Sequence, residues 1–339
     1  MFSYLKNILA GDIAIDLGTA NTLIWIKDKG IVLNEPSIVA YNTTNNEVIA
    51  VGDEAKKMLG RTHRGIKTVR PLKDGVVADY RMTDAMIQGF FRKLNLSRIS
   101  RPRVVICVPS GITDVERRSV SESANRANAS EVYLIEEPMA AAIGIGIDVS
   151  EPKGNMIVDI GGGTTEIAVI SLNGDNALET KRIAGDEQTQ AIVDWFKDNH
   201  KLNIGEATAE RIKCEMGSAI KVAGQKFNVK GQNIITGIPT TIEVLSSEIT
   251  EALSNTIKEI TDAIKHSLDK TPPELASDII EYGIILTGGG ALLRNLDVHI
   301  RKKTGLPVHV AEEPLLSVVH GTGKVLNDIK TYQKVLLQS

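Results

Sequence analysis

Two aspartates each end an apolar stretch and lie two residues before a glycine. Asp16 precedes Gly18, and Asp159 precedes Gly161. A carboxylate at a strand end lies where Mg²⁺ that bridges phosphates would be held, mostly through waters, because Mg²⁺ sheds its hydration shell reluctantly. Glycine-rich turns let the backbone come close to a ligand, so that successive N–H groups can converge on an anion. The pattern predicts a site for Mg²⁺ and a nucleoside triphosphate.

The pattern occurs twice, since residues 157–166 repeat the organisation of residues 13–22. A single Asp-x-Gly turn is ordinary hairpin chemistry. Two copies between apolar runs indicate two matching half-molecules that face each other across a cleft. The expected phosphate-binding residues are Thr19, Ala20 and Asn21 in the first turn and Gly161, Gly162 and Gly163 in the second.

A third candidate is Glu137, between an apolar strand and Pro138, which suits the first position of a helix. A carboxylate at a helix N-terminus near phosphate can orient and partly deprotonate an attacking water. The alternative is that Glu136 or Glu137 only caps the helix. Thr164 would help to hold that water through its hydroxyl, or would bond its own backbone as an ordinary turn residue.

The composition agrees with a soluble globular protein. With 339 residues the chain is long enough for two domains, and 42% of its residues are hydrophobic. The net charge of −3 gives no general attraction to nucleic acid. Cys107 and Cys214 are too few and too far apart for a disulfide framework or a zinc site, which suits the reducing cytosol. No apolar run reaches the ~20 residues that span a bilayer.

The first half alternates strands and helices, which favours sheets covered by helices. The residues from Thr113 to Glu116 form a capping-box pattern that predicts a helix start, and Asp186 and Thr208 are the expected caps of later helices. Apolar residues at three- and four-residue steps predict one long helix over 247–268. The expected lobes are 1–144 and 145–339, with small subdomains inserted at about 32–78 and 181–240.

Several segments resemble the actin superfamily and, within it, the MreB family of bacterial actins. The resemblance runs from about Gly11 to Lys324. The segments that carry it are 16–23 (DLGTANTL), 108–118 (VPSGITDVERR), 136–144 (EEPMAAAIG), 159–166 (DIGGGTTE) and 208–213 (TAERIK).

The resemblance implies a two-lobed α/β ATPase fold of duplicated mixed sheets flanked by helices, with ATP and Mg²⁺ in the interlobe cleft. It favours Glu137 over Glu136 as the residue that positions water. It also points to further residues at the base and ribose, which are Glu210, Arg211, Ile212, Lys213, Gly288, Gly289, Gly290 and Ala291. Without the resemblance, Glu210 and Lys213 would read as a solvated salt bridge and the glycines as a plain strand-to-helix turn.

The family resemblance further implies slow ATP hydrolysis, filaments of identical subunits and a role in cell shape. If the N-terminus is helical, Met1 and four further apolar residues lie on one face, and the expected membrane contacts among them are Phe2, Leu5, Ile8 and Leu9. Such a short helix can order against lipid headgroups, although with Lys6 as its only cation it would bind weakly. The alternative is a segment that packs on the body or stays disordered. We expect a cytoplasmic protein, peripheral at the inner membrane face, with membrane proteins of the shape-determining machinery as candidate partners.

Two other functions share the nucleotide pattern. A chaperone-type ATPase would need a further substrate-binding domain, and a small-metabolite kinase would need a catalytic base beside a polar substrate pocket, which the sequence does not reveal. One departure from commoner family sequences lies at Gln188 and Thr189, where Met-Asp is more usual. This departure bears on contacts in the second small subdomain.

Overall fold

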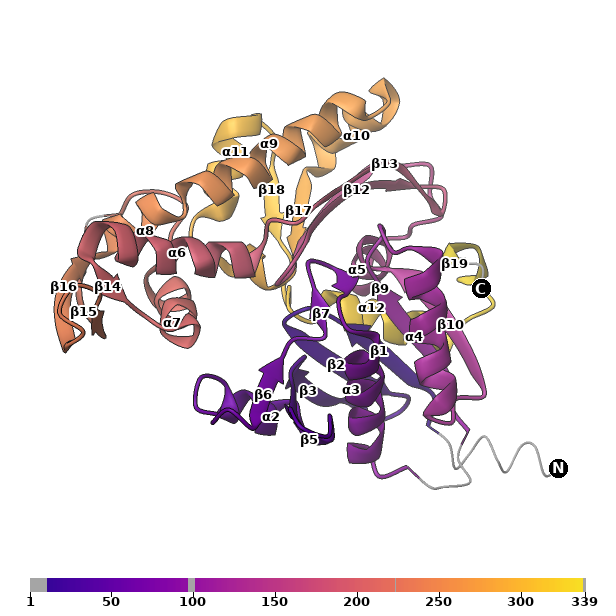
Figure 1. Ribbon diagram of the computed structural model, residues 1–339. Coiled ribbons are helices and arrows are strands. Elements are labelled where there is room, and N and C mark those ends of the chain that lie inside the picture. The colour runs from indigo at the N-terminus through magenta and orange to yellow at the C-terminus, as the bar shows by residue number, and fades with distance from the viewer. Residues whose placement is uncertain (1–10, 97–100, 223, 338–339) are drawn as a thin grey trace. The chain divides into compact units, whose positions relative to one another are not determined.

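The computed structural model describes residues 11–96, 101–222 and 224–337 (Figure 1). The chain forms two compact units, each with its own mixed sheet and helices. The first unit comprises Met1–Pro152, Ser171–Gly174 and Leu315–Ser339, and the second comprises Lys153–Ile170 and Asp175–Pro314. The C-terminal segment thus belongs with the first unit, whereas the sequence suggested two uninterrupted lobes.

The first unit is built on a six-stranded sheet in the order β19-β10-β9-β1-β2-β3. The β1–β2 and β2–β3 pairs are antiparallel, and β1–β9 and β9–β10 are parallel. Most side chains of the central strands β1, β2 and β9 are buried, whereas those of the edge strands β3 and β19 are more exposed. The strands are β1 (Ile13–Leu17), β2 (Asn21–Ile26), β3 (Gly30–Pro36), β9 (Arg103–Val108), β10 (Glu131–Glu136) and β19 (Leu336–Leu337).

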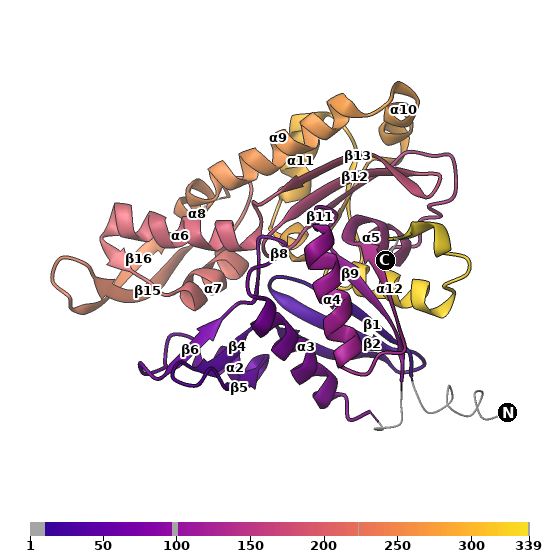
Figure 2. The same ribbon diagram turned by 45° about the vertical axis from the view of Figure 1, so that its right-hand side comes forward.

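Helices cover this sheet, as Figures 1 and 2 show. The predicted capping box is confirmed: Thr113 caps α4, its hydroxyl accepts a bond from the Glu116 N–H, and the Glu116 carboxylate accepts one from the Thr113 N–H. Pro138 lies in the first turn of α5, as expected. The helices are α3 (Tyr80–Lys93), α4 (Asp114–Arg126), α5 (Glu137–Gly144) and α12 (Ser317–Asn327).

Helices α5 and α12 pack with their backbones unusually close. A Cβ at Gly321 would lie 1.7 Å from the Ala140 carbonyl oxygen, and one at Gly144 would lie 1.8 Å from the Ser317 carbonyl oxygen. Lys324 of α12 also donates to the carbonyl oxygens of Ile143 and Gly144, each at 2.9 Å, and so caps the end of α5. Glu137 begins α5, so this contact fixes the helix that carries it.

A smaller sheet of the first unit has the order β5-β4-β6 and packs against α2 (Asp53–Met58). A two-stranded hairpin, β7–β8, follows it. The strands are β4 (Val39–Asn42), β5 (Val48–Val51), β6 (Ile66–Val69), β7 (Leu72–Lys73) and β8 (Val76–Val77).

The second unit repeats the plan with a five-stranded sheet in the order β13-β12-β11-β17-β18. The β11–β12 pair is an antiparallel hairpin and β11–β17 is parallel, as for β1–β2 and β1–β9. The repeat expected from the two Asp-x-Gly segments therefore has a structural counterpart. The strands are β11 (Asn155–Ile160), β12 (Thr165–Ser171), β13 (Gly174–Lys181), β17 (Ile284–Thr287) and β18 (Val308–Val310).

The helices of the second unit correct three expected boundaries. Helix α6 (Gly185–His200) has Ala184 as its N-cap, with Glu187 accepting from the Ala184 N–H at 2.9 Å, so Asp186 lies inside the helix. Helix α7 (Glu206–Met216) begins after Gly205, two residues before Thr208. The long expected helix is two helices, α8 (Ser246–Ala252) and α9 (Ser254–Lys270).

The rest of the second unit comprises α10 (Pro273–Tyr282), the 3-10 turn η1 (Gly289–Leu292) and α11 (Leu296–Thr304). A three-stranded sheet, β14-β15-β16, lies beside α6 and α8. Its strands are β14 (Leu202–Asn203), β15 (Lys226–Asn233) and β16 (Pro239–Leu245).

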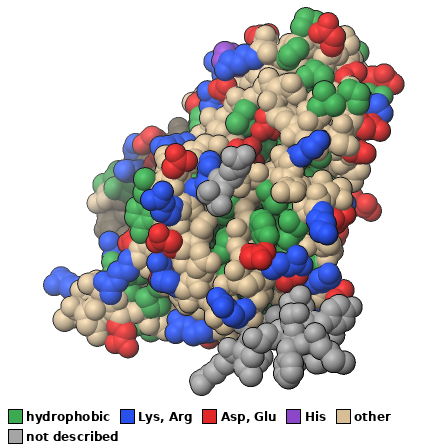
Figure 3. Space-filling model, turned by 90° about the vertical axis from the view of Figure 1, so that its right-hand side faces the viewer, with side chains coloured by type: hydrophobic (Ala, Val, Ile, Leu, Met, Phe, Trp, Pro, Cys, Tyr) green, Lys and Arg blue, Asp and Glu red, His purple; other side chains and the backbone are tan. Residues whose placement is uncertain are grey.

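Acidic and basic side chains are interspersed on the face drawn in Figure 3. This mixture agrees with the small net charge of −3. Of the helices that the structure describes, none is both long and apolar enough to cross a membrane.

The α5–α12 contact predicts that Gly321→Ala destabilises the protein, because the new methyl group has no room beside Ala140. We expect the free energy of unfolding to fall by about 2–3 kcal/mol, as for other overpacked cores, measured by urea unfolding without nucleotide. Gly111→Ala is the matched control, since Gly111 is exposed and a Cβ there meets nothing within 4 Å. Equal stability of the two variants would contradict the assigned contact.

Candidate functional site

The first turn, between β1 and β2, is held by a buried serine just after β3. The Ser37 hydroxyl donates to the Gly18 carbonyl oxygen at 2.6 Å, and its N–H donates to the Ala20 carbonyl oxygen at 3.0 Å. Ser37 also shares a 2.9 Å hydroxyl bond with Thr22. No local pattern in the sequence indicates a role for Ser37, because its contact with Gly18 depends on the β2–β3 register.

The four predicted residues of this turn differ in exposure. Thr19 is buried, Asp16 and Ala20 are half-buried, and Asn21 is exposed. Asp16 lies one residue before the end of β1, directly opposite Cys107 of β9.

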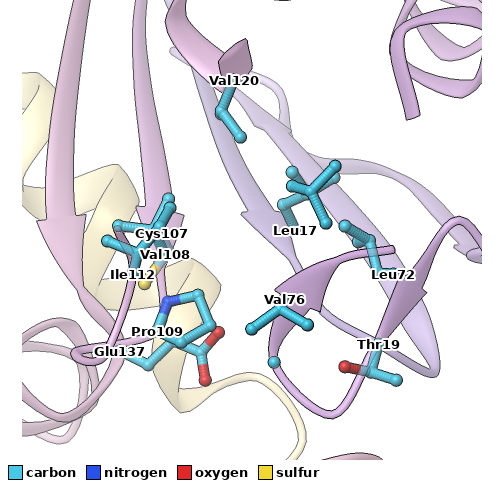
Figure 4. A pocket seen from close by; sticks show the side chains of 12 residues that line it. Leu17, Thr19, Leu72, Val76, Cys107, Val108, Pro109, Ile112, Val120 and Glu137 are labelled. Carbon is cyan, nitrogen blue, oxygen red and sulfur yellow. The ribbon is translucent and has the colours of Figure 1, made fainter. Parts of the chain in front are cut away.

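Thr19 and Glu137 line the same pocket of the first unit, although they are far apart in the sequence. Figure 4 shows the Glu137 carboxylate and the Thr19 hydroxyl on opposite sides of this pocket, directed toward the space between them. The other walls are mostly apolar, and only 9% of Glu137 is exposed. The remaining lining residues are Leu17, Leu72, Gly75, Val76, Val77, Cys107, Val108, Pro109, Ile112 and Val120.

One wall of the pocket is the β7–β8 hairpin, which Glu116 fixes to the start of α4. Glu116 Oε1 accepts a hydrogen bond from the Val77 N–H at 3.2 Å, while Oε2 accepts from the Thr113 N–H at 3.0 Å. Glu116 is buried, so these bonds are shielded from water. Glu116, the second residue of the α4 capping box, thus also positions a wall beside Glu137.

In the second unit, Asp159 lies near the end of β11 and is 5% exposed. The Thr287 hydroxyl, at the end of the neighbouring parallel strand β17, donates to Asp159 Oδ1 at 2.9 Å. Burial raises the pKa of Asp159 to about 6, although the bond from Thr287 works in the opposite direction. No local pattern in the sequence indicates a role for Thr287 either, because this bond depends on the pairing of β11 with β17.

The glycine turn after β11 is bonded to the start of α6. The Gly161 N–H donates to the Thr164 carbonyl oxygen at 2.9 Å, which closes the turn. The Gly185 N–H donates to Gly161 at 3.1 Å, and the Asp186 N–H donates to Gly162 at 2.7 Å, both to carbonyl oxygens. Gly163 and Thr164 are buried.

The predicted glycines after β17 pack closely on β11. Gly288 has φ +77°, and a Cβ there would lie 2.6 Å from Asp159 Oδ1. A Cβ at Gly290 would lie 2.2 Å from the Ile160 Cγ2. Ala291 is buried, whereas Gly289 is exposed. Gly288 and Gly290 therefore have a packing role of their own.

Glu210 and Lys213 form an ion pair on α7, with Lys213 Nζ 2.7 Å from Glu210 Oε2. Lys213 Nζ also donates to the Gly185 carbonyl oxygen at 2.7 Å, which links the pair to the glycine turn through α6. The side chains of the two residues between them lie elsewhere. Ile212 is in the hydrophobic core, and Arg211 pairs with Glu215 at 2.9 Å.

The predicted residues therefore form one group in each unit. Among residues 11–96, 101–222 and 224–337, no set of three or more His, Cys, Asp or Glu side chains could enclose a metal ion. Each predicted turn instead has a single aspartate beside it, Asp16 near the end of β1 and Asp159 near the end of β11. The predicted membrane residues, Phe2, Leu5, Ile8 and Leu9, lie outside the described residues.

The burial of Asp159 predicts that the free energy of unfolding depends on pH when the protein is free of nucleotide and Mg²⁺. Its carboxyl has a pKa of about 6 when folded, against an ordinary value of 3.8, so the unfolded chain ionises first as the pH rises. Stability contributed by this group is present below pH 4 and is lost between about pH 4 and 6. We expect Asp159→Asn to gain up to roughly 3 kcal/mol of unfolding free energy over the unmodified protein across that range.

Urea unfolding from pH 4 to pH 7.5 with a metal chelator measures this difference. Asp262→Asn, on the exposed side of α9, controls for the loss of one negative charge. A stability difference between Asp159→Asn and the unmodified protein that does not change with pH would contradict the assigned effect of burial.

Comparison with known proteins identifies close relatives over nearly the whole chain. The family model described as MreB/Mbl protein matches residues 10–334. The cell shape-determining protein MreB of Escherichia coli K12 is 51% identical over 336 residues, which is 97% of both chains. The cell shape-determining protein Mbl of Bacillus subtilis 168 is 46% identical over 329 residues, covering 96% of this chain and 99% of Mbl.

Solved structures of similar proteins have the same fold. The crystal structure of MreB5 of Spiroplasma citri bound to AMPPNP is 36% identical, with a TM-score of 0.91 over 96% of this chain and 98% of that one. A MamK filament structure, at 18% identity and a TM-score of 0.79 over 94% and 99% of the chains, shares the fold. The predicted actin-like α/β fold is thus confirmed, and the chain belongs to the MreB/Mbl family.

Proposed function

We propose that this protein is an ATP-binding, slowly ATP-hydrolysing cytoskeletal protein that forms membrane-associated filaments and determines or maintains cell shape. The observation that carries the proposal is the repeated hairpin, with an Asp near the end of the first strand and a tight turn after it, in both units. Two relatives that are 51% and 46% identical to this chain are named cell shape-determining proteins. MreB5, at 36% identity, has been solved with both AMPPNP and ADP.

In the proposed site both turns bind the phosphates of the same nucleotide. The backbone N–H groups of the turns supply hydrogen bonds without charge, which glycine makes possible by allowing close approach. The residues are Thr19, Ala20 and Asn21 in one unit and Gly161, Gly162 and Gly163 in the other. Because the Gly161 N–H already closes its own turn, Gly161 would contribute close approach of the backbone and not a hydrogen bond. Asp16 and Asp159 would hold Mg²⁺ through waters, and the ion would neutralise charge on the phosphates.

Glu137 and Thr164 are the proposed residues that orient the attacking water. Glu137 begins a helix and lies in a mostly apolar pocket, where few competing waters fit. A carboxylate in that position accepts a proton from the water as it attacks. We expect hydrolysis to be slow, since no second substrate requires rapid turnover. Glu210 and Lys213, with Gly288, Gly289 and Gly290, form the proposed nucleoside end of the site.

The family assignment also supports self-association, with nucleotide state controlling filament assembly. We also propose that each lobe contains a small inserted subdomain, at about 32–78 in the first lobe and 181–240 in the second. Membrane attachment through the apolar N-terminal residues would place the filaments at the cytoplasmic face of the membrane, in reach of membrane proteins of the shape-determining machinery.

Glu137→Gln tests the hydrolytic role. We expect phosphate release to fall about 100-fold or more, because the variant cannot take the proton, while affinity for Mg-ATP stays within about twofold. The unmodified protein should pellet on ultracentrifugation with Mg-ATP, and Glu137→Gln should remain in the pellet longer. Glu136→Gln is the matched control and should hydrolyse ATP normally. Unchanged phosphate release by Glu137→Gln would remove the assignment, and a chain that never pellets but phosphorylates a small metabolite would overturn the proposed function.

Deletion of residues 2–9 tests membrane attachment. The deleted residues include the four proposed apolar contacts, so flotation with phosphatidylglycerol–phosphatidylethanolamine vesicles should fall about fivefold or more. Pelleting with Mg-ATP in the absence of vesicles should be unaffected and serves as the control. Undiminished flotation would show that the N-terminus is not the anchor.

A further inference from the structure

A buried threonine of α6 lies within hydrogen-bonding distance of both members of the Glu210–Lys213 pair. Thr189 is 3% exposed. Lys213 Nζ is 2.9 Å from the Thr189 hydroxyl oxygen, and that hydroxyl also bonds to Glu210 Oε2. Thr189 is one of the two residues, with Gln188, that depart from commoner family sequences, and it is not among the proposed ligand-binding residues.

The three donors of the Lys213 ammonium group are all used within the protein. They go to the Gly185 carbonyl oxygen at 2.7 Å, the Thr189 hydroxyl at 2.9 Å and Glu210 Oε2 at 2.7 Å. An ammonium group has three N–H bonds and no acceptor. A nucleotide oxygen could therefore bond to Lys213 only by displacing one of these partners.

The Thr189 hydroxyl has one proton and two possible acceptors, Gly185 and Glu210. The Gly185 carbonyl oxygen is neutral and already accepts from Lys213, whereas Glu210 offers a carboxylate. Bonds to an ionised acceptor are roughly twice as strong as neutral ones. The proton therefore goes to Glu210, while the hydroxyl oxygen accepts from Lys213.

The two carboxylate oxygens of Glu210 are consequently unequal. Oε2 accepts from both Lys213 and Thr189, whereas Oε1 has a weak thiol donor, Cys214 Sγ, at 3.6 Å. Burial works to raise the pKa of Glu210, but the Lys213 charge and the bonds from Lys213 and Thr189 outweigh it and lower the pKa. The Glu210 side chain is 48% exposed, so its ionised carboxylate is within reach of a ligand, and Oε1 is the oxygen that lacks a strong donor.

We propose that Thr189 is a positioning residue of the nucleoside site, which locks Glu210 Oε2 to Lys213 and thereby presents Oε1 to a hydroxyl group of the bound nucleotide. This inference rests on the proposed nucleotide-binding function. In this proposal Glu210 contacts the ligand directly, while Lys213 and Thr189 act by positioning Glu210.

Thr189→Val tests the proposal, because valine keeps the shape of threonine and removes the hydroxyl. Calorimetry with Mg-ADP should give an affinity about tenfold lower, since Glu210 loses a donor and Lys213 loses an acceptor. Thr189→Ser keeps the hydroxyl and should bind within about twofold of the unmodified chain. Thr261→Val is the matched control: Thr261 is equally buried in α9, and its hydroxyl donates to the Ile257 carbonyl oxygen at 2.7 Å.

A double-mutant cycle separates positioning from general destabilisation. If Thr189 acts through Glu210, Thr189→Val should cost no further affinity once Glu210→Ala is present. Thermal unfolding of each variant reports folding, and Thr189→Ala replaces the valine variant if the latter does not fold. Unmodified affinity in the hydroxyl-free variant, or fully additive losses, would overturn the inference. Failure of the unmodified chain to bind Mg-ADP would instead overturn the proposed function.

Discussion

The second unit depends on a carboxylate that is buried before any ligand arrives. Asp159 is 5% exposed and has a pKa raised to about 6, so at neutral pH it carries a charge that burial opposes. Removing a carboxylate from water is costly unless the charge is paired and hydrogen-bonded. Thr287 supplies one hydrogen bond. In the proposed site, a cation beside Asp159 would offset more of this cost, and folding of this region would then be coupled to the binding of Mg²⁺ and phosphate.

Close backbone packing holds the residues around that carboxylate. Gly288 and Gly290 pack on β11 where a side chain has no room, and Gly185 bonds the glycine turn to α6. Lys213 then joins α7 to the same place through the Gly185 carbonyl oxygen. Four separate segments of the second unit thus meet at one turn. In the first unit, side-chain hydrogen bonds hold the corresponding region: Ser37 bonds to the first turn, and Glu116 bonds to the β7–β8 hairpin.

Local patterns in the sequence predicted the elements well. The two hairpins, the capping box at Thr113 and the helix that begins at Glu137 all follow from residue types within a few positions of one another. The starts of α6 and α7 were predicted less well. At α6 the residue that caps is Ala184, whose backbone bonds to Glu187, so no polar side chain marked the position. Asp186 and Thr208 are residue types that often cap helices, but here they lie inside α6 and α7.

Contacts between distant residues could not be predicted, because they depend on strand register. Ser37 meets Gly18 only after β2 and β3 pair, and Thr287 meets Asp159 only after β17 joins β11. The C-terminal segment joins the first unit because β19 pairs with β10 and α12 packs on α5, which no local pattern indicates. The sequence did identify Glu210 and Lys213 as a pair, and the structure adds Thr189 between them.

The central claim is that both turns bind one nucleotide together. Calorimetric titration of the full chain with AMPPNP and Mg²⁺ tests it most directly, using the unmodified protein, Asp16→Ala and Asp159→Ala. The account predicts one site per chain, and it predicts that either substitution alone weakens that site about tenfold or more. Two independent sites per chain, or a site that is weakened by one substitution and indifferent to the other, would contradict it.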